Sequence, residues 1–182
     1  VGRVEIGTDG YCTGVLISPS LVLTAAHCMF DAQNLPVLVT AISFRAGLRD
    51  GKVTAQRSVA RYVVPDRYDI LVPLSTGTIA YDVALLELTK PIPTTLADPF
   101  VIHDGDGQDQ RVSVVSYGIG RDDALSWQRD CGVLGQWQGV LFFDCNTTFG
   151  SSGAPVFLKH HNRARILSLV SAGRNAKGET LS

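Results

Sequence analysis

Three residues with acid–base or nucleophilic side chains stand at positions that suit catalysis. His27 follows an apolar segment and precedes a cysteine, Asp82 stands at the head of an apolar segment, and Ser152 lies in a Gly-flanked turn. Acyl transfer uses a hydroxyl nucleophile, a base that takes its proton and a carboxylate that orients the base. The order is His, Asp, Ser, with separations of 55 (82 − 27) and 70 (152 − 82) residues. The three therefore form a candidate catalytic triad.

Each of these residues also has a simpler interpretation. A single His is more often structural than catalytic, an Asp before a strand is commonly a turn former, and Gly-Ser-Ser-Gly is commonly only a turn. Asp69 is an alternative carboxylate, but Pro73 follows within four residues and disfavours a strand there. Ser151 adjoins Ser152 but lacks its Gly-x-Ser-Gly context. For these reasons we prefer Asp82 over Asp69 and Ser152 over Ser151. Because all three segments occur together, we favour the catalytic interpretation over the simpler ones.

The four cysteines suggest two disulfides and an oxidising compartment. Three connectivities are possible, and the sequence-local one is the simplest. It joins Cys12 to Cys28, 16 residues apart, and Cys131 to Cys145, 14 residues apart. A metal site or free thiols are the alternative, although the chain has no Cys-x-x-Cys and no Cys–His cluster with zinc spacing. The first residues contain no basic stretch followed by an apolar segment, so we expect any signal peptide to lie outside these 182 residues.

Composition excludes several classes of protein. The chain has 182 residues, of which 45% are apolar and 18% charged, so it is not a disordered or acidic-tail protein. A net charge of −1 argues against binding of nucleic acid by charge alone. The apolar runs are short, and none approaches the ~20 residues of a membrane-spanning helix.

The elements that position these residues are predicted to be strands. Apolar residues occur in short, often alternating runs between turn clusters, and no stretch keeps a period of 3.6. Many short strands with Gly- and Pro-rich turns predict an all-β sandwich or barrel. The segment Thr89–Pro99 breaks the pattern, which predicts two β units, residues 1–95 and 96–182. The expected strands are Tyr11–Ile17, Leu21–Thr24, Val37–Phe44, Ala60–Pro65, Val83–Leu88, Arg111–Tyr117, Val140–Cys145, Ala154–Phe157 and Ile166–Ser171.

Taken together, the motifs resemble those of the trypsin/chymotrypsin-like serine protease family. The resemblance extends over most of the chain, and the motifs come in the family's order. They are the histidine motif Thr24–Cys28 with Cys12 ahead of it, the aspartate motif Asp82–Leu86, the strand Arg111–Gly118, the serine motif Gly150–Pro155 and the segment Ser171–Gly173.

This resemblance implies a fold and a set of roles. It implies two antiparallel six-stranded β-barrels, with the active site in the cleft between them. Residues 1–95 would carry His27 and Asp82, and residues 96–182 would carry Ser152 and the specificity pocket. Ser152 would be the nucleophile, His27 the general base and then acid, and Asp82 the group that orients His27. The backbone N–H groups of Gly150 and Ser152 would form the oxyanion hole.

The resemblance also implies residues around the triad. Ser171 would donate a hydrogen bond to the Asp82 carboxylate, and Ser171, Ala172 and Gly173 would offer backbone groups to an extended substrate. Cys12 would pair with Cys28.

Three departures from the family pattern, at Ser151, Asn146 and Val170, refine this interpretation. Ser151 stands where the family usually has an Asp that pairs with a new amino terminus, which Val1-Gly2 resembles. Some bacterial relatives also lack this Asp, including the glutamyl endopeptidase subgroup, so we expect a bacterial secreted or periplasmic protein. Asn146 stands where trypsin-type enzymes have an Asp, which argues against a strong preference for Lys or Arg. Thr147 resembles a Thr of the glutamyl subgroup, but Val170 replaces that subgroup's His.

The sequence thus predicts a serine endopeptidase that acts through an acyl-enzyme intermediate on a protein or peptide substrate. We expect a monomer that needs no cofactor or metal, because the triad supplies its own base and charge stabilisation. The alternative is a catalytically silent member of the same family that binds a protein, peptide or glycan. An unrelated β-sandwich binding module would leave the ordered triad to coincidence. An enzyme should bring the His27 ring within hydrogen-bond reach of Ser152 and Asp82.

Overall fold

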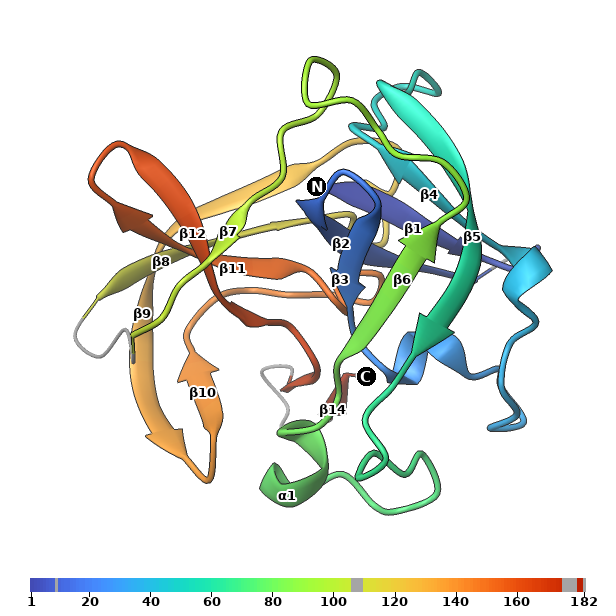
Figure 1. Ribbon diagram of the computed structural model, residues 1–182. Coiled ribbons are helices and arrows are strands. Elements are labelled where there is room, and N and C mark those ends of the chain that lie inside the picture. Colours follow the sequence, from blue (N-terminus) through green and yellow to red (C-terminus); the bar gives the residue numbers. More distant parts are fainter. Residues whose placement is uncertain (9, 106–109, 175–179, 182) are drawn as a thin grey trace.

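The apolar segments of the first half of the chain pair into a closed barrel. In the computed structural model, which describes residues 1–8, 10–105, 110–174 and 180–181, six antiparallel strands follow the order β1-β2-β3-β6-β5-β4 around the barrel (Figure 1). Alternate side chains of β4 and β6 are buried, as the period of a strand requires. The strands are β1 (Gly2–Ile6), β2 (Gly10–Ser18), β3 (Leu21–Thr24), β4 (Ile42–Ala46), β5 (Ala55–Val63) and β6 (Ala84–Leu88).

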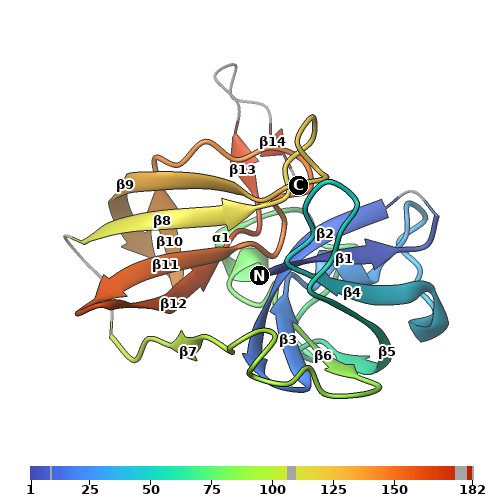
Figure 2. The same cartoon turned by 90° about the horizontal axis from the view of Figure 1, so that it is seen from above.

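The second half forms a six-stranded sheet beside the barrel, in the order β10-β9-β8-β11-β12-β7 (Figure 2). Five of these strands pair antiparallel, and the short β7 pairs parallel with β12. A two-stranded ribbon, β13–β14, follows. The bounds are β7 (Val101–Ile102), β8 (Arg111–Ser116), β9 (Ser126–Trp137), β10 (Val140–Phe143), β11 (Pro155–His160), β12 (Arg163–Leu169), β13 (Gly173–Arg174) and β14 (Thr180–Leu181).

The two units share an apolar interface. Val15 of β2 packs with Phe157 of β11 and Ile166 of β12, and all three side chains are at most 5% exposed. Phe100, in the connection between the units, packs against Phe157 with the two rings tilted and their centroids 4.5 Å apart. The interface is therefore a continuation of the core, which holds the two halves of the candidate site against each other.

In the part of the chain that the structure describes, helix is confined to three single turns: η1 (His27–Met29), η2 (Val39–Ala41) and α1 (Thr76–Ile79). Ser75 begins α1 with a capping box, because its hydroxyl accepts the Thr78 N–H and the Thr78 hydroxyl accepts the Ser75 N–H. Among the described residues, no helix has the length and apolar character needed to cross a membrane.

The all-β class is confirmed, but several strand bounds differ from the expected ones. The segment predicted as Val37–Phe44 becomes a strand only at Ile42, because residues 39–41 take a 3-10 turn. The long strand β9 was not predicted at all. Most of its side chains are exposed, so it lacks the apolar alternation that marks a half-buried strand. The strand β1 and the two-residue strands β7, β13 and β14 were also missed.

Candidate active site

Strand pairing inside the barrel brings His27 and Asp82 together. Strand β3 pairs with β6 so that Thr24 lies opposite Ala84. His27 follows three residues after Thr24, in η1, and Asp82 lies two residues before Ala84. The Cys12–Cys28 disulfide ties η1 back to β2. The position of the His27 ring is thus set by a strand end on one side and a covalent bond on the other.

Asp82 is a buried carboxylate with three hydrogen-bond donors. Its side chain is 5% exposed. Oδ1 accepts the His27 backbone N–H at 2.8 Å, and Oδ2 lies 2.7 Å from His27 Nδ1 and also accepts the Ser171 hydroxyl. Burial alone would raise the pKa of Asp82, but hydrogen bonds from His27 and Ser171 and the charge of His27 lower it below its ordinary value. The carboxylate is therefore ionised at neutral pH.

The ionised Asp82 determines which nitrogen of His27 can act as a base. Because a carboxylate only accepts hydrogen bonds, His27 Nδ1 carries the proton that it shares with Asp82. Nε2 of a neutral ring is then an acceptor. This atom is buried and has no hydrogen-bond partner among the described residues. A buried acceptor without a donor is costly in a folded protein. Nε2 is therefore an acceptor that is available to take a proton or a hydrogen bond from a bound group.

Two glycines fix the tight turn that carries Ser152, within the segment Thr148–Gly153 that we call the serine loop. Gly150 has a φ of 85°, and an added Cβ would lie 2.5 Å from the Tyr117 carbonyl oxygen. Gly153 has a φ of 73°, and its Cβ would lie 2.7 Å from the Ala25 nitrogen. No other residue type fits these positions without strain. The close approach of Gly153 to Ala25 packs the serine loop directly on the segment that leads to His27.

Among the described residues, three backbone N–H groups of the serine loop have no acceptor, those of Phe149, Gly150 and Ser152. The N–H groups of Gly150 and Ser152 are the two predicted to form the oxyanion hole. The carbonyl of Phe149 accepts the Ile119 N–H at 2.8 Å, and the carbonyl of Ser151 accepts the Ala154 N–H at 2.9 Å. In a trans peptide the N–H points opposite to the carbonyl. Holding these two carbonyls therefore restrains the direction of both N–H groups, as an oxyanion hole requires.

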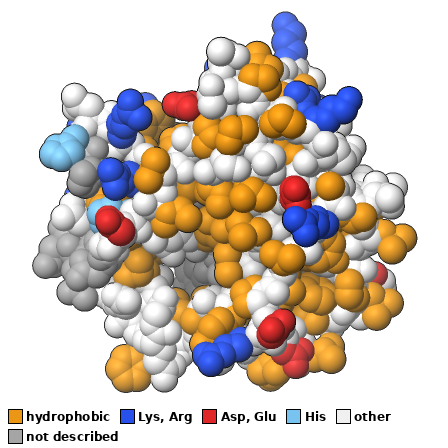
Figure 3. Space-filling view, viewed as in Figure 1, with side chains coloured by type: hydrophobic (Ala, Val, Ile, Leu, Met, Phe, Trp, Pro, Cys, Tyr) orange, Lys and Arg blue, Asp and Glu red, His pale blue; other side chains and the backbone are white. Residues whose placement is uncertain are grey.

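Two hollows adjoin these residues, and Ser171 lines both. The first lies beside Ser152, with a lining of Thr147, Thr148, Phe149, Val170, Ser171 and Gly173. The second has a volume of about 410 Å³ and lies beside His27 and Asp82. Its wall is the segment that precedes and includes α1, and most of that wall is apolar: Tyr68, Ile70, Leu71, Val72, Pro73, Leu74 and Ile79. Apolar side chains also spread across the centre and lower part of the face seen in Figure 3.

Comparison with known proteins identifies the family. A family model described as "Trypsin-like peptidase domain" matches residues 12–164. The chain belongs to the trypsin-like peptidase family. One relative, the glutamyl endopeptidase of Bacillus licheniformis, is 27% identical over 172 residues, which cover 93% of this chain and 52% of the relative. A trypsin of Phaedon cochleariae is 36% identical over 86 residues, which cover 45% of this chain and 29% of that protein. The chain thus spans about half, or less, of the length of these relatives.

Solved structures support the fold assignment of this chain. A Glu endopeptidase in complex with MPD superposes with a TM-score of 0.78 at 22% identity, covering 98% of this chain and 81% of that one. The thermostable serine protease AL20 gives a TM-score of 0.76 at 18% identity, with 98% and 87% covered. The predicted two-unit, all-β fold of this family is confirmed.

The structure brings some predicted site residues into contact and leaves others apart. His27, Asp82 and Ser171 are joined by hydrogen bonds. Ser152 lies at the adjoining hollow, but within the described part of the chain no hydrogen bond joins it to His27. Such catalytic hydrogen bonds are often long until substrate is bound.

The predicted substrate-binding residues divide in the same way. Thr147, Ser171 and Gly173 line the hollow beside Ser152, whereas its described lining does not include Asn146 or Ala172. The backbone N–H of Asn146 instead donates to Gln128 Oε1 at 2.6 Å.

The two disulfides join the predicted sequence-local pairs, Cys12–Cys28 and Cys131–Cys145. The sulfur atoms of Cys12 and Cys28 lie within 4.8 Å of a His27 ring nitrogen, a grouping that resembles a metal site. Because both sulfur atoms are bonded to each other, neither is a thiolate that could bind a metal.

Sequence reasoning missed the polar contacts behind Ser152. The side chain of Ser151 is buried, and its hydroxyl donates to Ser116 at 3.0 Å, in the place where the family has a charged Asp. The wall of the hollow beside His27 was also missed. Its signal was the apolar run from Ile70 to Leu74, which lies outside any predicted strand.

Proposed function

We propose that the chain is a serine endopeptidase that hydrolyses peptide bonds through an acyl-enzyme intermediate. The observation that carries this proposal is the state of His27. Its Nδ1 is held by the ionised Asp82, and its Nε2 is a buried acceptor without a partner among the described residues. That atom is in the state that a general base needs in order to take a proton from a serine.

The first half of the proposed reaction acylates Ser152. Its Oγ attacks the substrate carbonyl carbon while its proton moves to His27 Nε2, and the ring becomes cationic beside the Asp82 carboxylate. The negative oxygen of the tetrahedral intermediate accepts hydrogen bonds from the N–H groups of Gly150 and Ser152. The C–N bond then breaks, the amine leaves with the proton from Nε2, and an ester to Ser152 remains.

The second half releases the acyl group by the same steps. A water molecule gives a proton to His27 Nε2 and attacks the ester carbonyl carbon. The oxyanion again accepts hydrogen bonds from the N–H groups of Gly150 and Ser152. The C–O bond to Ser152 breaks, and Oγ recovers its proton from His27. All atoms balance as peptide plus water giving a carboxylic acid and an amine, so the residues named here suffice for the reaction.

Substrate selection in this proposal depends on the two hollows. The described lining of the hollow beside Ser152 carries no charged side chain, so we expect no strong preference for Lys or Arg there. The hollow of about 410 Å³ beside His27 is lined mainly by apolar side chains and is large enough for a bulky apolar side chain of the substrate. We therefore expect cleavage of proteins or peptides with an apolar residue near the scissile bond.

The two disulfides bear on the compartment of the protein. They fit an oxidising location, so an extracellular location is supported. We propose a secreted or periplasmic monomer that does not bind nucleic acid, in keeping with the net charge of −1.

Labelling with a fluorophosphonate at neutral pH, followed by intact mass, tests the proposal. We expect one adduct on the native protein and none on Ser152→Ala. Ser43→Ala is the control, because it removes a serine hydroxyl from β4 of the barrel, and Ser43 is in the described lining of neither hollow. A folded, disulfide-bonded protein that gives no adduct would contradict the proposal and favour the alternative, a silent member that binds a protein, peptide or glycan.

A further inference from the structure

Thr13 of β2 makes four hydrogen bonds at the junction of the two units. Its side chain is fully buried. Its N–H donates to the Ser152 carbonyl at 2.8 Å, and its hydroxyl donates to the Gly150 carbonyl at 2.9 Å. The hydroxyl oxygen also accepts the Tyr117 N–H at 3.0 Å, and the Thr13 carbonyl accepts the Thr24 hydroxyl at 2.8 Å. Thr13 thus contacts the serine loop, Tyr117 just after the end of β8, and Thr24 at the end of β3.

The Gly150 carbonyl is unusual in how it is held. The carbonyls of Thr148, Phe149, Ser151 and Ser152 each accept a backbone N–H. The carbonyl of Gly150 has a side-chain hydroxyl as its sole donor among the described residues, and that hydroxyl belongs to Thr13. Its place in the loop therefore depends on a group that a single substitution removes.

We propose that Thr13 is a positioning residue, whose hydroxyl orients the peptide between Gly150 and Ser151 and thereby aligns the two N–H groups of the oxyanion hole. This inference rests on the proposed function, because it assigns Thr13 a part in the same reaction. The site lacks the charged Asp of the family at position 151, and its loop is held by neutral hydrogen bonds instead.

The peptide between Gly150 and Ser151 links the two peptides that supply the N–H groups. Its orientation sets how these groups point relative to each other. Gly150, with a φ of 85°, has no Cβ to restrict rotation of this peptide. Without the Thr13 hydroxyl, the Gly150 carbonyl loses its partner, and rotation toward another donor relieves the cost of an unmade hydrogen bond. The rotation turns the N–H groups away from the place where the oxyanion forms.

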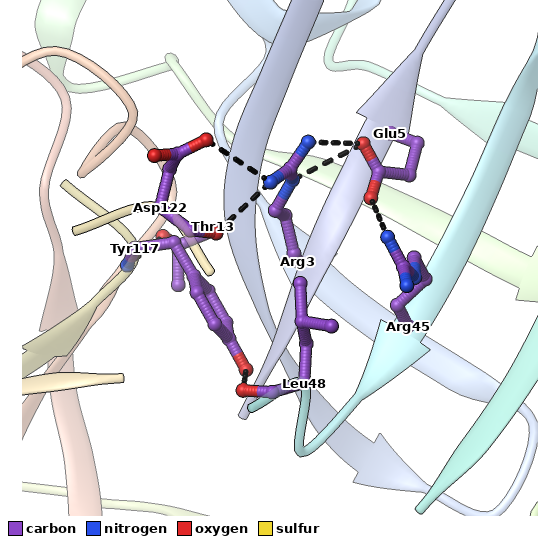
Figure 4. A network of polar contacts seen from close by, with 7 residues as sticks. All are labelled: Arg3, Glu5, Thr13, Arg45, Leu48, Tyr117 and Asp122. Carbon is purple, nitrogen blue, oxygen red and sulfur yellow. Dashed lines mark hydrogen bonds and ion pairs between the residues drawn. The ribbon is translucent and has the colours of Figure 1, made fainter. Parts of the chain in front are cut away.

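Polar contacts around Thr13 join the two units (Figure 4). Tyr117, whose N–H the Thr13 hydroxyl accepts, is buried and donates its hydroxyl to the Leu48 carbonyl of the barrel at 3.1 Å. Arg3, opposite Thr13 in β1, donates to the Asp122 carbonyl at 2.9 Å and pairs with Glu5 at 2.9 Å. A rigid junction makes a single hydroxyl an effective support for the loop.

Thr13→Val tests the proposal because it keeps the shape of the side chain and removes the hydroxyl. Thr24→Val is the matched control. Thr24 is equally buried at the same junction, and its hydroxyl also donates to a backbone carbonyl, but that carbonyl belongs to Thr13 and not to the serine loop. Thr13→Ser keeps the hydroxyl and removes only the methyl group. The measurements are the maximal rate and the half-saturating concentration of fluorophosphonate labelling, the thermal midpoint, and hydrogen exchange of residues 148–153.

We expect Thr13→Val to lower the maximal labelling rate about 10- to 100-fold, less than the 10²–10³-fold typical of losing an oxyanion donor, with little change in half-saturation. Thr13→Ser should retain most of the rate. Thr24→Val should lower the thermal midpoint comparably and the rate much less. Equal rate losses in the two Val variants, or a loss confined to half-saturation, would overturn the proposal.

The hydrogen-exchange readout keeps this test separate from the proposed function. If the unaltered protein gives no adduct, the proposed function fails, and exchange still decides the role of Thr13. Faster exchange of residues 148–153 in Thr13→Val than in Thr24→Val supports the positioning role. Equal exchange in the two variants contradicts it.

Discussion

At the scale of single residues, the ionised Asp82 links the candidate site to the stability of the fold. Its pKa is lowered in the folded protein, so the native state binds fewer protons at this carboxyl than the unfolded chain does. The resulting stabilisation is fully present above the unfolded pKa of about 4 and disappears as the pH falls through the lower folded value. The contribution of this residue is therefore largest at neutral pH.

Asp82→Asn tests this linkage. We expect the difference in unfolding free energy between the unaltered protein and the variant to be greatest near pH 7 and to shrink below about pH 4, since both then carry a neutral group. Urea unfolding at a series of pH values measures the difference. The effect of the other carboxyl groups on stability cancels, because both proteins contain them. A difference that stays constant down to pH 2.5 or grows on acidification would contradict the assignment.

A second prediction at this scale concerns the close approach at Gly153. Gly153→Ala should destabilise the fold by more than about 2 kcal/mol, because its Cβ collides with backbone atoms at a positive φ. Gly120→Ala is the matched control, with a similar φ of 81° and open space around its Cβ. Denaturant unfolding of both variants separates the collision from the cost of φ. Equal destabilisation would show that the packing of the serine loop on Ala25 is loose.

At the scale of elements, two disulfides of nearly equal loop length occupy different places. Cys12–Cys28 closes a separation of 16 residues and anchors the turn that carries His27. Cys131–Cys145 closes a separation of 14 residues and ties β9 to the segment ahead of the serine loop. By chain entropy, removing either should cost about 3 kcal/mol. The two pairs therefore allow stability and positioning to be separated.

Replacing each pair by alanines should lower the unfolding free energy by similar amounts. At a temperature where both variants are folded, loss of Cys12–Cys28 should reduce the labelling rate of Ser152 more, because η1 is then held only by noncovalent contacts. Denaturant unfolding and fluorophosphonate labelling on the same samples provide the comparison. A larger rate loss from the Cys131–Cys145 pair would place the sensitive element in the second sheet instead.

The segment that precedes and includes α1 allows a test of substrate selection. Leu71 is 73% exposed and lines the hollow beside His27, whereas Leu38 is 76% exposed and belongs to the segment ahead of η2. Leu71→Lys should lower cleavage of peptides with a bulky apolar residue near the scissile bond about tenfold or more, with stability changed by at most about 0.5 kcal/mol. Leu38→Lys should change neither. A peptide library that varies each residue flanking the scissile bond measures the effect, and an unchanged preference would refute a role for this hollow.

How far the sequence predicts each element depends on where its partners come from. Strand β3 and the two disulfides follow from local pattern and short separations, and they agree with the structure. Strand β9 was missed because it is mostly exposed. The contacts of Thr13 with Gly150 and Tyr117 join residues 137 and 104 positions apart, and neither end has a local signature. Such contacts arise from the docking of the two units, which composition and periodicity do not encode.

At the scale of the whole molecule, the candidate site exists only where the two units meet. The barrel supplies His27 and Asp82, and the second sheet supplies Ser152 and Ser171. The shared cluster around Val15 and the hydrogen bonds of Thr13 cross the same junction. If the junction is part of one cooperative core, neither unit can unfold alone without exposing apolar surface of the other.

Phe44→Ala measures that coupling from deep inside the barrel. The Phe44 side chain is fully buried there, so its truncation should cost about 3–5 kcal/mol. In one cooperative unit, the slowest-exchanging amides of β8 and β11, in the other sheet, should then exchange about 10²- to 10⁴-fold faster, as much as those of β4 and β6. Hydrogen–deuterium exchange with mass spectrometry reads all four strands at once. Faster exchange confined to the barrel would mean that the second sheet persists when the barrel opens, and that the site is assembled by docking of two independently stable units.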